Sequence, residues 1–159
     1  MTNDDIAQKL ALLPEGIAEK NLRSWEPVVT HYKEFAEHPF GDILPNNFYD
    51  IAFPAIYKLV KDLSNSEQAK LFRGGTSVYD LFISTANEHG IKIGDRFVSV
   101  TFRANNKIII QYEIASPITL EENPNVIKRV YCEAEDNLML ELQPMLDLLW
   151  NETRGKKNA

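Results

Sequence analysis

The strongest constraint on the fold is the stretch DRFVSVTFRANNKIIIQYEI at residues 95–114, where apolar and polar residues alternate. Side chains of a β-strand point to opposite faces in turn, so a period of two predicts strands rather than a helix. Two strands, at 95–104 and 107–115, flank Asn105 and Asn106, and asparagine tolerates the positive φ of a tight turn. A hairpin on its own is only marginally stable, so this one must pack against other elements.

Two loop lengths are open for this hairpin, and each sets a different register. A two-residue loop pairs Val98 with Glu113 and mixes polar and apolar groups on both faces. A three-residue loop, 105–107, pairs Val98 with Ile114 and gathers the apolar side chains on one face. Misplacing two large apolar side chains costs ~3–6 kcal/mol by lost burial, so we favour the three-residue loop.

The first 90 residues show a helical period that is interrupted by proline and glycine. This pattern predicts helices at 3–13, 15–23, 24–38 and 47–63, a short helix ending at Phe72, and a helix at 77–90. Ser24 is expected to cap the third helix, with Pro27 in its first turn, where a missing N–H costs least. In the fourth helix, Ile51 is expected on the buried stripe.

The segment VIKRVYC at 126–132 suits either a strand or the first turn of a helix, and both remain open. A C-terminal helix is predicted from 134 to 151, with a kink at Pro144. The predicted class is α+β: an N-terminal helical layer packed on a small antiparallel sheet (the hairpin near 95–115) with a C-terminal helix.

The domain organisation follows from the length of 159 residues and the lack of repeats or linkers, which predict one globular domain over 1–152. A flexible basic tail is predicted at 153–159. Cys132 is the single cysteine, so no internal disulfide forms, which favours a reducing, cytoplasmic location. We expect no membrane partner, because no run approaches the ~20 apolar residues of a spanning helix.

No catalytic residue, metal site or cofactor site is predicted. His31 and His38 are seven residues apart, which places them ~10.5 Å apart along a helix, too far to share one zinc ion. Cys132 is expected to be a buried, inert thiol. The protein is therefore more plausible as a binding protein than as an enzyme.

The stretch LFRGGTSVYDLF at 71–82 has two interpretations. Gly74 and Gly75 suit a hinge between two helices, and this is favoured because no Gly-Lys-Ser/Thr ending follows. The weaker interpretation is an anion-binding loop formed by Arg73, Gly74, Gly75 and Thr76.

The net charge of −6 opposes non-specific nucleic-acid binding and suggests a basic protein partner. Residues 121–152 alone hold eight acids against two bases. The residues predicted to bind the partner, along the outer side of the C-terminal helix, are Glu133, Asp136, Leu140, Asp147 and Trp150.

The resulting hypothesis is a small acidic cytoplasmic protein-binding module. One form is an immunity or inhibitor protein that neutralises a basic toxin such as a nuclease. The alternative is a small-molecule-binding protein or enzyme, with a pocket between the helical layer and the hairpin. A homo-oligomeric structural subunit is a third hypothesis.

Overall fold

The computed structural model describes residues 1–38, 48–88, 90–103, 106–116 and 125–155. Its elements are α1 (Asn3–Ala11), α2 (Ile17–Glu37), α3 (Tyr49–Ser64), the 3-10 helix η1 (Glu67–Lys70), β1 (Arg73–Ser77), β2 (Asp80–Ser84), β3 (Arg96–Arg103), β4 (Lys107–Ile114), β5 (Val126–Cys132) and α4 (Leu138–Glu152). The strands form one antiparallel sheet in the order β1-β2-β3-β4-β5. The predicted α+β class, with N-terminal helices and a C-terminal helix, is confirmed.

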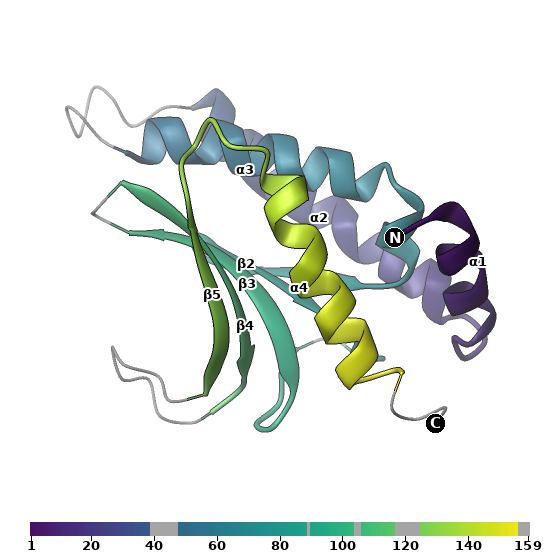
Figure 1. Ribbon diagram of the computed structural model, residues 1–159. Coiled ribbons are helices and arrows are strands. Elements are labelled where there is room, and N and C mark those ends of the chain that lie inside the picture. The colour runs from purple at the N-terminus through teal and green to yellow at the C-terminus, as the bar shows by residue number, and fades with distance from the viewer. Residues whose placement is uncertain (39–47, 89, 104–105, 117–124, 156–159) are drawn as a thin grey trace.

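The core lies between the helices and one face of the sheet. Figure 1 shows α2 and α3 side by side, with α4 running obliquely past the sheet, where it contacts β3, β4 and β5. The sheet residues that face the helices are almost completely buried: Leu81, Ile83, Val98, Val100, Phe102, Ile108, Ile110 and Tyr112. No helix within the described ranges is both long enough and apolar enough to cross a membrane.

The β3–β4 hairpin confirms the predicted faces but not the predicted register. Val98 pairs with Tyr112 rather than with Ile114. The connection is therefore 104–106, of which the first two residues lie outside the described part, rather than 105–107. A slip of two residues leaves every side chain on its face, so the burial argument determines the faces but cannot separate these two registers.

The hinge expected at Gly74 and Gly75 and the helix expected at 77–90 are both wrong. Residues in this region form β1 and β2, whose turn lies between the paired residues Ser77 and Asp80. Val78 in this turn has a φ of 50°, a conformation that β-branched residues rarely adopt. No local turn signal therefore marked this hairpin.

Helix α2 explains how the turn is held, because it runs along β1 and hydrogen-bonds to the backbone of that region. The bonds are Asn21 Nδ2 to Lys70 O (2.9 Å), Trp25 Nε1 to Phe72 O (3.0 Å), Gly74 N to Ser24 Oγ (2.9 Å), His31 Nε2 to Val78 O (2.6 Å) and Tyr32 OH to Tyr79 O (3.1 Å). These contacts join segments about 50 residues apart, and the Ser24 hydroxyl occupies the backbone N–H of Gly74 on the edge strand β1.

The same contacts account for a second correction. Residues 15–23 and 24–38 do not form two helices, because α2 continues through Ser24 and Pro27. The Ser24 hydroxyl donates to Asn21 O within the helix (2.5 Å) instead of capping a helix start. Pro27 removes one backbone bond, and the anchoring of α2 along β1 offsets that loss.

Helix α3 buries most of the expected stripe, including Ala52, Ile56, Leu59 and Val60, but not Ile51. Ile51 is 57% exposed, whereas Phe53 is 0% exposed. The Phe53 ring stacks on Phe35, with centroids 4.4 Å apart, and makes an edge contact with Phe102. The helix is thus rotated toward Phe53, so that an aromatic cluster meets the core beside the aliphatic residues of the stripe, while Ile51 faces outward.

The C-terminal part resolves the open alternative at 126–132 in favour of a strand, β5, paired with β4. Helix α4 begins at Leu138 rather than at residue 134, because the Asn137 side chain caps it by accepting from Leu140 N (3.2 Å). After α4, Arg154 is buried and hydrogen-bonds to Asn87 Oδ1. Residues 153–155 are therefore packed on the fold, and 156–159 lie outside the described part.

Candidate functional site

The outer face of α4, defined here as Leu140, Pro144 and Asp147 together with Asp136 in the preceding turn, carries three of the five predicted partner-binding residues. Within α4, spacings of four and three residues place Leu140, Pro144 and Asp147 on one side of the helix, whereas Asp136 precedes the helix and its N-cap Asn137. Leu140 is 68% exposed. The face therefore presents one large apolar side chain, with the Asp147 carboxylate further along the helix and the Asp136 carboxylate in the turn before it.

The other two predicted residues do not belong to this face. Trp150 is 2% exposed and makes an edge contact with the Phe72 ring, at 6.2 Å between centroids. It follows Leu142, Leu146 and Leu149 on the buried stripe, so it belongs to the core. Glu133 forms an ion pair with Lys107 at the start of β4.

Both carboxylates of this face accept hydrogen bonds from neighbouring groups. Asp136 accepts from Glu133 N (2.7 Å), and Asp147 accepts from Gln143 Nε2 (3.0 Å). Burial, followed by the charges of Glu141 and Asp136, raises the pKa of the Cys132 thiol to about 11. This thiol is therefore protonated at neutral pH, as expected for an inert cysteine.

The predicted anion-binding loop is not a loop, because Gly74, Gly75 and Thr76 lie in β1 and pair with β2. Gly74 packs against Trp25, and its N–H is bound by Ser24. Backbone N–H groups of a strand do not converge on one point as those of a phosphate-binding loop do. Arg73, in contrast, lines a cavity.

That cavity, called the cationic cavity below, has a volume of about 450 Å³. Its lining comes from α2, from the start of β1 and from the segment after β2: Lys20, Arg23, Ser24, Arg73, Asn87 and Glu88. Sequence reasoning missed Lys20 and Arg23. They lie one turn apart on α2, and nothing local indicates that Arg73 joins them.

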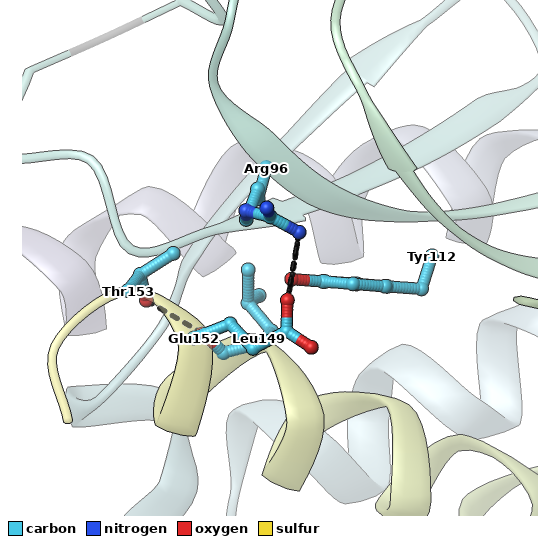
Figure 2. Close-up of polar contacts among 5 residues, drawn as sticks. All are labelled: Arg96, Tyr112, Leu149, Glu152 and Thr153. Carbon is cyan, nitrogen blue, oxygen red and sulfur yellow. Dashed lines mark hydrogen bonds and ion pairs between the residues drawn. The ribbon is translucent and has the colours of Figure 1, made fainter. Parts of the chain in front are cut away.

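A second cavity of about 420 Å³ adjoins the first at Asn87, and residues 84–87, 94–96 and 152–154 line it. Figure 2 shows the charged cluster at its edge. Arg96 Nη1 donates to Glu152 Oε2 (2.7 Å), and the Tyr112 hydroxyl donates to the same oxygen (3.0 Å). Because Arg96 and Glu152 neutralise each other, this cluster serves mainly to join the end of α4 to β3 and β4.

Between the helices and the hairpin, the side chains of Val98, Tyr112 and Leu149 are each completely buried in the core. Within the described residues, no group of three or more histidine, cysteine, aspartate or glutamate side chains is arranged to hold a metal ion.

The sheet face opposite the helices holds a polar network centred on Glu113. Its Oε2 accepts from Ser99 Oγ (3.0 Å) and from Gln111 Nε2 (3.1 Å). Burial raises the pKa of the Glu113 carboxyl above its usual 4.5, and these two hydrogen bonds offset only part of that effect. At neutral pH the ionised carboxylate is therefore less stable here than in the unfolded chain.

Glu113→Gln, which keeps an oxygen acceptor, is therefore expected to raise the free energy of unfolding at pH 7. As the pH falls through the raised pKa toward 4.5, the carboxyl of the native protein takes up a proton before that of the unfolded chain. The free energy of unfolding of the wild type therefore rises, and the difference in this free energy between Glu113→Gln and the wild type becomes smaller. Urea unfolding at several pH values measures this. Glu135→Gln at an exposed site reports the effect of removing one surface charge. A stability difference that grows on acidification would contradict the prediction.

Comparison with known protein families, curated proteins and solved structures finds no match for this chain. Its function is therefore inferred from its own residues.

Proposed function

We propose that this protein is a protein-binding module that presents the outer face of α4 to a basic partner. The observation that carries the proposal is Leu140, which is 68% exposed in the first turn of α4, after Asp136 and before Asp147 in the sequence. A large apolar side chain surrounded by polar groups is the arrangement of many interface centres, where the apolar group is desolvated and the charges select the partner.

The charge of the chain supports a basic partner. The net charge of −6 attracts a cationic protein over long range. Close carboxylates then fix its orientation, which contributes more to association rate and specificity than to affinity. One concrete form is an inhibitor or immunity protein that covers the basic, substrate-binding surface of a toxin such as a nuclease. Such a protein acts by occlusion and needs no catalytic group.

The test uses two variants of the face and two matched controls elsewhere. Leu140→Ala removes the apolar anchor and is expected to raise the Kd for a captured partner by about tenfold, equivalent to ~1.4 kcal/mol. Asp147→Lys is expected to slow association and to reduce its dependence on salt. The controls are Ile93→Ala, at an exposed isoleucine, and Asp62→Lys, at an exposed aspartate of α3.

Affinity capture followed by binding kinetics at several salt concentrations measures these effects. The proposal requires that the partner be basic, that binding weaken with salt, and that the two α4 variants be affected more than the two controls. Equal losses in variants and controls, or binding insensitive to salt, would show that another surface is responsible.

A further inference from the structure

The cationic cavity gathers positive charge on a protein of net negative charge. Lys20 and Arg23 of α2 and Arg73 of β1 line it together with the single acid Glu88. Glu88 also pairs with Lys92 (4.0 Å), so the lining keeps at least two positive charges, whereas the whole chain carries −6. Like charges brought together repel one another, so the cavity is complementary to an anion that carries two negative charges.

The Arg73 side chain is held in place with unused donor capacity. Its Nη1 donates to Asn87 O (3.3 Å). Its Nε is buried and has no hydrogen-bond partner among the described residues. Because this atom is shielded from solvent, a ligand in the cavity would meet the Nη groups of Arg73 rather than its Nε. A guanidinium presents its donors in a planar fork that matches an oxyanion.

The walls of the cavity are fixed relative to each other. Ser24 lies between them, because its hydroxyl donates to Asn21 O of α2 (2.5 Å) and accepts from Gly74 N of β1 (2.9 Å). The bond from Trp25 Nε1 to Phe72 O fixes the same junction. The backbone of the site is therefore fixed before a ligand binds, whereas the exposed side chains of Lys20 and Arg23 lose rotamer freedom on binding.

We propose that the cationic cavity binds the phosphate group of a small phosphate monoester. Such a group carries about −1.5 to −2 charges at pH 7, which matches the two uncompensated positive charges, whereas a carboxylate supplies one. The volume of about 450 Å³ lies in the range of small-molecule sites. Lys20 and Arg23 provide charge from α2, and Arg73 provides the oriented donors. This site is separate from the outer face of α4 and does not depend on the proposed function.

The test uses inorganic phosphate as the probe and acetate as the carboxylate comparison, at constant ionic strength and pH 7.5. Isothermal titration calorimetry is expected to give one saturable phosphate site with a Kd of about 1 mM or lower, and acetate is expected to bind at least about tenfold more weakly. Arg73→Gln and Arg23→Gln are each expected to raise the phosphate Kd at least about tenfold, because each variant loses a charged hydrogen bond to the ligand.

Lys58→Gln removes one cation from an exposed position on α3 and is the matched control, expected to leave the phosphate Kd unchanged. Arg23 is exposed, so its variant remains informative if Arg73→Gln fails to fold. Absence of saturable binding, equal affinity for acetate, or an equal loss in Lys58→Gln would overturn the proposal. Leu140→Ala and Asp147→Lys are expected to leave phosphate binding intact, which keeps this test separate from that of the α4 face.

Discussion

Gly74→Ala is expected to lower the free energy of unfolding by about 2–3 kcal/mol, the range for overpacking a buried site. A Cβ atom at Gly74 would lie 2.9 Å from two ring atoms of Trp25, closer than carbon atoms pack. The indole cannot move away easily, because it is buried and its Nε1 donates to Phe72 O at 3.0 Å. Urea unfolding measures the change.

Gly75→Ala is the matched control, one residue further along the same strand. A Cβ at Gly75 meets nothing within 4 Å, and its φ is not positive. Alanine there is expected to be neutral or to stabilise by up to about 1 kcal/mol, because it reduces the entropy of the unfolded chain. Equal stability of the two alanine variants would show that the Trp25 contact does not constrain position 74.

Phe53→Ala is expected to cost about 3–5 kcal/mol, the range for a large side chain removed from a core. The Phe53 ring is completely buried, stacks on Phe35 at 4.4 Å and contacts the edges of Phe102 and Tyr79 at 5.1 and 5.6 Å. Its loss leaves a cavity at the point where α2, α3 and the sheet meet. Thermal or urea unfolding gives the size of the effect.

Ile51→Ala tests the orientation of the same helix. Ile51 is 57% exposed, so its truncation is expected to change stability by less than about 0.5 kcal/mol. The helical stripe in the sequence instead places Ile51 in the core. An Ile51→Ala loss as large as that of Phe53→Ala would favour the stripe over the rotated helix.

Part of the candidate sites could be predicted from the sequence and part could not. Helical spacing alone predicted the positions of Leu140 and Asp147, because both lie on one side of a single helix. It misplaced Trp150, since the buried stripe of α4 is wide enough to include it. It also could not combine Arg73 with Lys20 and Arg23, because about 50 residues separate them and no local pattern records that approach.

The sequence by itself determined the features that depend on local periodicity: the α+β class, the two faces of the β3–β4 hairpin and the C-terminal helix. Each follows from which side chains share a face within one element. Only the tertiary structure decided that 73–84 is a hairpin and that α2 is continuous. There, hydrogen bonds from α2 side chains to the backbone of distant residues hold a turn with Val78 at positive φ, and such long-range contacts outweigh local preference.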